Sequence, residues 1–319
     1  MSKTFTDLTR HALNGPTMGT RWSALFHAPA GFEANALQAA LATAVGEVDR
    51  QMSAWKPESD LNRLNAAAPG AWVRVPAGMM KVLSAGLAIG EASGGAFDIG
   101  IGDAARAWGF GPPPADPGAI RAAARPARPH AHKVVELDPA RSRVRRHAPI
   151  QLDLNGIAKG FGVDRLAETA HAFGLDAALV AIDGELRALG SQPDGTPWAV
   201  AVEAPDPERR APHSLLALTE TAVATSGDYR HWIQLGPRRL GHLIDPDRGR
   251  PLPAGFASVS VLAEDCMSAD AWATALMVLG KDRGLPLARR LGLRAIFVDP
   301  AGADAAPPLP ARHPPALAP

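Results

Sequence analysis

The chain of 319 residues contains a single cysteine, Cys266. One cysteine cannot form an internal disulfide, so covalent cross-links do not hold this fold together. No stretch approaches the roughly 20 apolar residues that a membrane span needs. The first ten residues also lack the apolar run of a secretory signal. With a formal net charge of only +1, the sequence gives no reason to expect a nucleic-acid partner. We therefore expect a soluble, globular, cytoplasmic protein.

Several catalytic and nucleotide-binding motifs are missing as well. The chain has no Walker A sequence, no cysteine–histidine cluster of the zinc-binding kind and no G-x-S-x-G nucleophile elbow. Residues 100–105 match the pattern G-x-G-x-x-A, but only residues 96–99 precede them as a possible strand. No acidic residue follows about 20 positions later, where a dinucleotide-binding unit would carry one. We therefore reject a Rossmann site.

Hydrophobic periodicity alternates between strand and helix types without the regular βα alternation of a parallel doubly wound sheet. This favours an α+β fold in which a mostly antiparallel sheet is flanked by helices. Helices are predicted at residues 33–51, 59–65, 76–92, 156–173 and 268–279, with Gly94 and Gly95 stopping the third. Strands are predicted at residues 20–27, 72–75, 178–182, 198–202, 215–218, 231–235 and 258–262, and in a meander over 134–153.

Two segments lack this periodicity. Residues 111–130 are rich in proline, alanine and arginine, and we interpret them as a surface connection with one short helix. The tail over residues 299–319 is rich in proline and alanine and is expected to be disordered.

Asp270 and Thr274 stand four residues apart at the start of a predicted helix, so their side chains share one face. Both supply hard oxygen ligands of the kind that Mg²⁺ prefers. The alternative is purely structural: Ser268 or Asp270 caps the helix and Thr274 bonds back to a carbonyl. On these residues alone the two interpretations are equally good.

Residues 153–160, with the sequence DLNGIAKG, lead from a strand end into a helix. Lys159 lies in the first turn of that helix, where the helix dipole disfavours a cation. A bound phosphate would explain the lysine, because helix N-termini attract anions. The alternative is a solvated lysine on a surface helix.

His242 lies just ahead of an Asp-Pro turn formed by Asp245 and Pro246. An imidazole between apolar neighbours and a loop carboxylate suits a group that titrates near neutrality. A lone histidine is nevertheless more often structural. Cys266 is interpreted as a small buried hydrophobe, because the sequence pairs no base with it.

In combination, these motifs resemble the ApbE family of FAD:protein FMN transferases. The motifs that carry the resemblance follow in the family order: residues 18–20 (MGT), 52–55 (MSAW), 95–98 (GAFD), 153–160 (DLNGIAKG), 225–228 (TSGD), 242–246 (HLIDP) and 269–274 (ADAWAT). The resemblance spans residues 16–298, which we take as the ApbE-like domain. Residues 1–15 are then an N-terminal extension.

The resemblance implies a Mg²⁺-dependent enzyme that splits FAD, transfers FMN to a threonine or serine hydroxyl of an acceptor flavoprotein and releases AMP. It implies that Asp270 and Thr274 bind the metal together with the backbone carbonyl of Gly156. His242 corresponds to the proposed general base of the family. The positions expected to contact FAD are Met18, Trp55, Ala96, Phe97, Asp98, Asp153, Lys159 and Ile244.

The chain departs from the family pattern in three places. The usual Gly-Gly-Asp appears as Asp183-Gly-Glu185, and the Asp-Pro-Thr after the Ala-Phe pair appears as Asp98-Ile-Gly. Ala273 replaces an aspartate that some relatives carry, which makes a second metal less favourable. Many relatives are exported lipoproteins, whereas no lipobox cysteine stands near this start. Two other functions remain open: an FAD pyrophosphatase that uses water as the acceptor, and a flavin-binding protein without catalysis.

Overall fold

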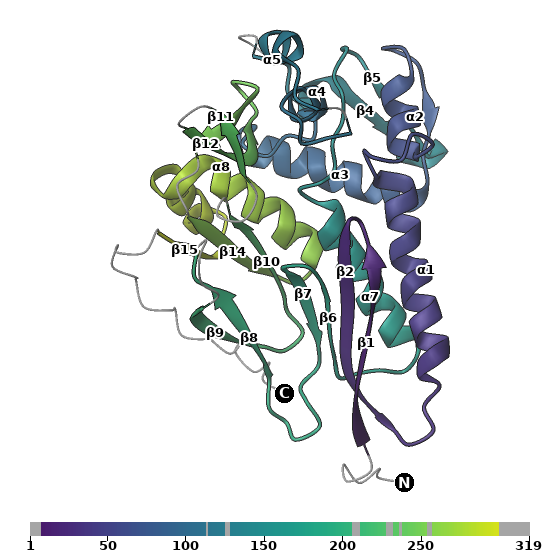
Figure 1. Cartoon of the computed structure of the whole chain (residues 1–319). Helices are drawn as coiled ribbons and strands as arrows, with labels where there is room; N and C mark the ends of the chain where they lie inside the picture. The colour runs from purple at the N-terminus through teal and green to yellow at the C-terminus, as the bar shows by residue number, and fades with distance from the viewer. Residues whose placement is uncertain are drawn as a thin grey trace, which may run out of the picture.

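The computed structural model describes residues 8–112, 114–124, 128–205, 211–227, 232–235, 238–253 and 257–299. Its centre is a seven-stranded sheet in which every neighbouring pair of strands is antiparallel (Figure 1). The strands, in spatial order, are β1 (Leu8–Thr17), β2 (Thr20–Pro29), β6 (Ala178–Ile182), β7 (Glu185–Leu189), β10 (Ala222–Gly227), β14 (Ser258–Ala263) and β15 (Arg294–Val298). This arrangement, with helices around it, confirms the predicted α+β class.

Helices α7 (Ala158–Ala172) and α8 (Cys266–Arg290) pack on the sheet and on each other, and α1 (Ala34–Met52) packs on α7. Strand β2 turns its alternate residues toward this helical layer, with Trp22 and Phe26 fully buried. The buried residues of α1 recur every three or four positions, as an amphipathic helix requires: Leu37, Leu41, Ala44, Val45, Val48 and Met52.

A two-stranded hairpin covers the other face of the sheet. It consists of β8 (Trp198–Glu203) and β9 (Pro212–Leu218). Trp198 and Leu218 pack there against residues such as Leu25 of β2, which point away from the helices. The sheet is therefore buried on both faces.

Smaller elements surround the ends of the sheet. One three-stranded sheet pairs β3 (Val73–Arg74), β5 (Arg143–Arg146) and β4 (Val135–Asp138), and another pairs β11 (Trp232–Leu235), β12 (Arg238–Asp245) and β13 (Arg250–Pro253). The remaining helices are α2 (Asp60–Ala66), α3 (Ala77–Ala92), α4 (Gly102–Ala107), α5 (Pro117–Ala123), α6 (Ala131–Val134) and a 3₁₀ turn (Pro139–Arg141).

The structure differs from the sequence-based expectations at two places. Residues 8–15, expected to belong to an extension, form most of β1 at the edge of the main sheet. The motif at residues 225–228, TSGD, has the residue types of a polar turn. In the structure it is instead the end of β10 as far as Gly227, because Thr225–Gly227 pair with β14. Asp228, His231 and the tail beyond Asp299 lie outside the described residues.

Helix ends were predicted more accurately. Helix α3 stops at Ala92, just ahead of Gly94 and Gly95, which adopt φ values of 66° and 87°. The predicted stop at residue 279 coincides with a break inside α8, where Gly280 adopts φ 69° and ψ 174°. Such a left-handed, extended conformation is nearly restricted to glycine. Glycines with positive φ therefore end α3 and the first part of α8.

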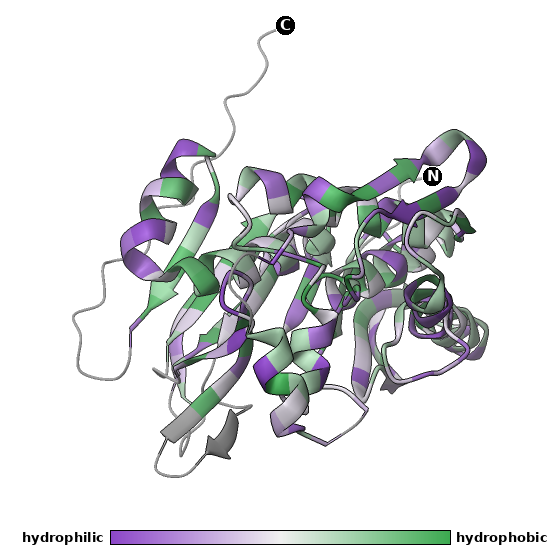
Figure 2. Cartoon of the chain, turned by 90° about the horizontal axis from the view of Figure 1, so that it is seen from above, coloured by the Kyte–Doolittle hydropathy of each residue, from purple (hydrophilic) through white to green (hydrophobic). Residues whose placement is uncertain are grey.

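Hydrophilic and hydrophobic residues interchange along the helices and strands (Figure 2). Within the described part of the chain, no helix combines the length and hydropathy required to cross a membrane.

The break in α8 gives a test of the fold. Gly280→Ala should lower the free energy of unfolding by about 1–3 kcal/mol, because alanine is strained at this φ and ψ. Gly46, inside α1, is a matched control, since a Cβ atom added at either glycine would meet nothing within 4 Å. Gly46→Ala should instead stabilise the protein by about 0.5–1 kcal/mol, because alanine is the better helix former. Urea unfolding measures both changes, and equal signs would contradict the assigned backbone conformation.

Candidate active site

A cavity of about 1040 Å³ lies among the main sheet, helices α7 and α8, and strand β12. The structure brings every predicted site residue to its wall: Met18, Trp55, Ala96, Phe97, Asp98, Asp153, Gly156, Lys159, His242, Ile244, Asp270 and Thr274. These residues come from segments far apart in the chain. The cavity is therefore the candidate active site, while the separate role of each residue stays a prediction.

Helices α7 and α8 approach so closely that only glycine fits at Gly160. A Cβ atom there would lie 2.3 Å from the carbonyl oxygen of Cys266 and 2.8 Å from the Cβ atom of Asp270. The N–H group of Gly160 donates to Asp270 Oδ2 at 3.0 Å. This bond fixes the orientation of the Asp270 carboxylate on α8.

Three predicted metal donors lie in one corner of the cavity. Asp270 and Thr274 occupy successive turns of α8, and Thr274 Oγ1 lies 3.2 Å from Ser226 Oγ of β10. Gly156 lies against Thr274, because a Cβ atom on Gly156 would be 3.3 Å from Thr274 Oγ1. A carboxylate, a hydroxyl and a nearby backbone carbonyl form a set of hard oxygen donors that could hold Mg²⁺.

Lys159 and Glu185 form an ion pair beside this corner. The Lys159 Nζ atom lies 2.8 Å from Glu185 Oε1 and 3.7 Å from Asp183 Oδ2. Burial alone would lower the pKa of Lys159, but the carboxylates of Glu185, Asp270 and Asp183 outweigh it and raise that pKa above its ordinary value. The lysine therefore stays protonated.

The neighbouring carboxylates are poorly solvated. Burial raises the pKa of Glu185 to about 8 and also raises the pKa of Asp270. The second oxygen of Glu185, Oε2, is buried without a hydrogen-bond partner among the described residues. A positively charged ligand would favour the ionised form of these groups, so the corner suits a cation.

Aromatic and apolar side chains line other parts of the wall. Trp55 is 57% exposed, whereas Phe97 is buried and lies beside Gly156, whose Cβ atom would be 3.2 Å from the Phe97 ring. Ile244 is also buried and packs with alanines of α4 and α5. These surfaces can accept a planar ring system.

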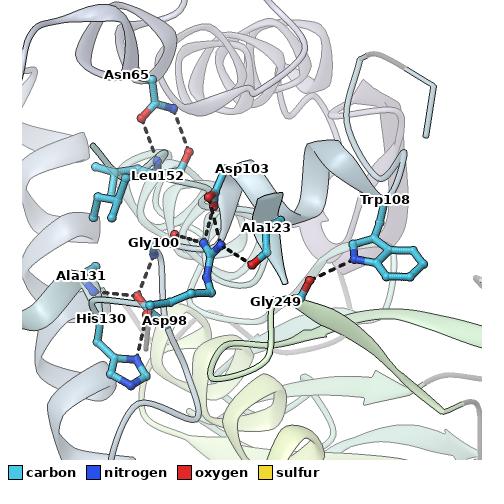
Figure 3. Close-up of polar contacts among 12 residues, drawn as sticks. Asn65, Asp98, Gly100, Asp103, Trp108, Ala123, His130, Ala131, Leu152 and Gly249 are labelled. Carbon is cyan, nitrogen blue, oxygen red and sulfur yellow. Dashed lines mark hydrogen bonds and ion pairs between the residues drawn. The ribbon is translucent and has the colours of Figure 1, made fainter. Parts of the chain in front are cut away.

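Asp98 has protein partners for both of its carboxylate oxygens. Oδ1 accepts from the N–H groups of Gly100 at 2.7 Å and Ala131 at 3.0 Å, and Oδ2 bonds His130 Nδ1 at 2.9 Å (Figure 3). The side chain is 6% exposed. Asp98 therefore fixes the loop after α3, in addition to lining the cavity.

His242 is half-buried on β12 and lines the cavity with Ile244. Asp245, the loop carboxylate that follows His242 in the sequence, accepts the N–H groups of Asp247 at 3.0 Å and Arg248 at 3.2 Å. Its carboxylate thus shapes the turn that follows. Asp153 accepts both the backbone N–H and the side-chain amide of Asn155, at 2.8 and 3.0 Å, and burial raises its pKa.

Asp164 is the site-forming residue that the sequence analysis missed. Its buried carboxylate accepts the N–H groups of Cys266 and Met267, both at 2.9 Å, and lies 2.6 Å from Arg187 Nη1. The first N–H groups of a helix have no partner within the helix, so Asp164 satisfies two of them and ties α8 to α7 and β7. The sequence does contain a signal for this role, because Asp164 is a carboxylate on the apolar face of the predicted helix, four residues after Gly160.

The Asp164 contact can be tested through the single cysteine. Cys266 is fully buried and burial raises its thiol pKa well above the ordinary range, so we expect negligible reaction with a thiol reagent in the native protein. Asp164→Asn leaves Arg187 unpaired and should lower the free energy of unfolding by about 3–5 kcal/mol. Labelling of Cys266 should then be at least about tenfold faster, since 1.4 kcal/mol is a factor of ten.

Asp176→Asn is the control for this experiment, because Asp176 is 87% exposed and faces His171 at the far end of α7. It should leave the labelling rate unchanged. Equal labelling of the Asp164 variant and the wild type would show that Asp164 does not hold the start of α8.

The chain is similar in sequence and in structure to known proteins. The family model described as "ApbE family" matches residues 18–297. An FAD:protein FMN transferase from Vibrio cholerae is 33% identical over 282 residues, which cover 86% of this chain and 83% of the relative. One from Klebsiella pneumoniae is 33% identical over 295 residues, covering 91% and 84%. The apo crystal structure of the Pseudomonas stutzeri flavinyl transferase ApbE is similar with a TM-score of 0.80 and 33% identity, covering 95% and 94% of the two chains.

The family resemblance drawn from the motifs is thus confirmed by three independent comparisons. The matches extend over both helices of the metal corner, the loop after α3 and strand β12. Because the family model and the curated relatives cover nearly the whole chain, the protein belongs to the ApbE family and is a transferase.

Proposed function

We propose that this protein is an FAD:protein FMN transferase that cleaves the diphosphate of FAD, attaches FMN to a threonine or serine hydroxyl of an acceptor protein and releases AMP. The carrying observation is that a single cavity joins aromatic and apolar walls to a corner of hard oxygen donors. Trp55 and Phe97 offer surfaces for the isoalloxazine ring. Asp270 and Thr274 offer oxygen donors for the cation that a diphosphate would need in this cavity. The names of the relatives support the same activity.

The charge of the cavity supports a role for Mg²⁺. Carboxylates on its wall outnumber lysines: Asp49, Asp98, Asp153, Asp183, Glu185, Glu203 and Asp270 stand against Lys56 and Lys159. A diphosphate would be repelled by this surface unless a cation offset the charge. We assign Mg²⁺ to Asp270, Thr274 and the carbonyl of Gly156. When bound, it would neutralise charge on the diphosphate oxygens.

The protein residues then have distinct tasks. Lys159, held by Glu185, contributes a fixed positive charge near the same corner. As the acceptor oxygen bonds to the FMN phosphorus, the bond from that phosphorus to the bridging oxygen breaks and AMP leaves with the oxygen. A neutral imidazole nitrogen of His242 takes the proton of the attacking hydroxyl. The aromatic wall holds the flavin while the phosphorus is attacked.

The proposed activity can be tested with a protein substrate of the Vibrio cholerae relative, prepared without flavin. Incubation with FAD and Mg²⁺ should give one AMP for each flavin that stays on the denatured acceptor, measured by chromatography and by in-gel flavin fluorescence. Chelation of Mg²⁺ with EDTA should abolish both signals, and added Mg²⁺ should restore them. Equal amounts of free FMN and AMP without labelled acceptor would identify a pyrophosphatase and overturn the proposal.

Asp270→Asn refines this metal test, because it keeps the size of the side chain but removes its charge. It should abolish turnover at ordinary Mg²⁺ concentrations, since a hard cation strongly prefers a carboxylate to an amide in a site with so few protein ligands. Ser268→Ala, on the same turn, is the control and should retain activity, because Ser268 Oγ bonds Asp265. Activity of the Asp270 variant close to that of the wild type would remove this residue from the metal site.

His242→Ala tests the general base. A base contributes typically 10²–10⁴-fold, so the rate of FMN transfer at saturating FAD should fall by about that factor. The FAD dissociation constant and the Mg²⁺ requirement should stay close to those of the wild type. A parallel loss of FAD affinity, with the single-turnover rate preserved, would instead make His242 a binding residue.

A further inference from the structure

The turn between β12 and β13 lies directly after the strand that carries His242 and Ile244. We call residues 245–249 the hairpin turn. Within it, the carbonyl oxygen of Asp245 accepts the N–H groups of Arg248 at 3.3 Å and Gly249 at 2.8 Å. Hydrogen bonds within the turn thus fix its shape, whereas its contacts with other elements fix its position.

His130 connects the hairpin turn to the cavity wall. Its Nδ1 atom lies 2.9 Å from Asp98 Oδ2, and its Nε2 atom lies 3.2 Å from Asp247 Oδ1. The imidazole is 14% exposed, whereas the Asp247 carboxylate is 76% exposed. A Cβ atom on Gly95 would lie 2.5 Å from the ring, so the glycine leaves room for it. One imidazole therefore bridges a buried carboxylate of the site and an exposed carboxylate of the turn.

A second contact fixes the other end of the turn. Trp108 Nε1 donates to the carbonyl oxygen of Gly249 at 3.0 Å (Figure 3). Gly249 passes so close to the carbonyl of Ala123 that its Cβ atom would lie 2.3 Å from that oxygen. Arg128 donates to the same carbonyl at 3.1 Å and also pairs with Asp103. Ala123 and Arg128 belong to residues 111–130, which the sequence analysis interprets as a surface connection. They thus support the turn.

Packing beneath the turn is incomplete. A cavity of about 310 Å³ separates Asp245, Pro246 and Asp247 from the loop around Gly95 and from Val278, Leu279 and Arg283, which flank the break in α8. Because the turn borders a cavity on that side, its contacts with His130, Trp108 and Ala123 contribute to its position. The His130 bridge spans from the turn to this loop region.

We propose that His130 is a positioning residue, which holds the hairpin turn through Asp247 and thereby places His242 for proton transfer. The proposal rests on the proposed function, because it assumes that His242 acts on the acceptor hydroxyl. His130 itself contacts neither reacting group. Its hydrogen bond to Asp98 anchors the ring, and its 3.2 Å contact with the Asp247 carboxylate links that anchor to the hairpin turn. Misplacement of a reacting group by about 1 Å can cost 10²-fold in rate, so even a small shift of the turn matters.

Asp247→Ala is the sharpest test, because it removes only the exposed end of the bridge and leaves the His130–Asp98 bond in place. We expect the kcat of FMN transfer to fall by about fivefold, a size that suits the loss of one partly exposed ion pair. His130→Ala should lower kcat by about tenfold or more. The double variant should be no slower than His130→Ala, because both substitutions break one bridge. His130→Gln, which keeps a side-chain donor, should recover part of the loss.

Asp176→Ala is the matched control, since Asp176 is another exposed carboxylate facing a histidine, His171. It should leave kcat unchanged. In Asp247→Ala and Asp176→Ala the Tm and the FAD dissociation constant, measured without Mg²⁺, should stay near the wild-type values. Hydrogen exchange in peptides from β12 to β13 should be faster in Asp247→Ala and His130→Ala only. A kcat within twofold of wild type with unchanged exchange overturns the proposal, as does a fall in Tm and FAD affinity that parallels kcat.

The exchange measurement also separates this proposal from the proposed function. If the wild type fails to label the acceptor, the proposed function fails, and exchange in the hairpin still decides whether His130 holds the turn. If the wild type labels the acceptor and neither variant changes exchange or kcat, the proposed function stands and the positioning role is wrong.

Discussion

The buried carboxylate of Asp164 is the contact on which the rest of the site depends. It accepts two N–H groups from the first turn of α8 and pairs with Arg187 on β7. Asp265 caps the next N–H group, that of Ser268, so the start of α8 is bound by two carboxylates. This fixes α8 against α7 at its N-terminal end, and Asp270 lies one turn further along. The geometry of the metal corner follows from that junction.

The same junction explains why small residues occupy the motif before and within α7. Gly160 permits the backbone of α8 to approach, and its N–H group orients Asp270. Close approach also concentrates negative charge, since Asp164, Asp270 and Glu185 are all buried within this region and burial raises the pKa of each. Asp164 is compensated by Arg187, and Glu185 by Lys159. Asp270 is the third buried carboxylate of this region, and it accepts the N–H group of Gly160.

Local sequence signals predicted most helices and strands, because amphipathic periodicity and glycine stops act within a few residues. Strand β1 was missed since it is an edge strand: only Gly15 and Thr17 are buried, and Gly15 and Pro16 are typical of turns. The family motifs predicted the members of the cavity wall. They did not reveal Asp164 or the His130 bridge, each of which has a partner more than a hundred residues away in the chain. Such contacts are set by how elements pack, which periodicity does not report.

The two sides of the cavity are supported by different physical means. The side with Asp270 and Thr274 rests on a helix whose residues Ala269, Ala271 and Ala273 are completely buried between α7 and the sheet. The side with His242 rests on a hairpin in which Ile244 is buried against α4 and α5, while the turn that follows has polar contacts with His130 and Trp108 beside a second cavity. Elements with fewer buried apolar contacts open at lower free energy. Under the proposed function, the rigid side serves the metal and the diphosphate, which need fixed geometry throughout. The hairpin side faces the acceptor, a whole protein that must enter and leave in every turnover, so the contacts that hold His242 there, including the His130 bridge, carry its positioning.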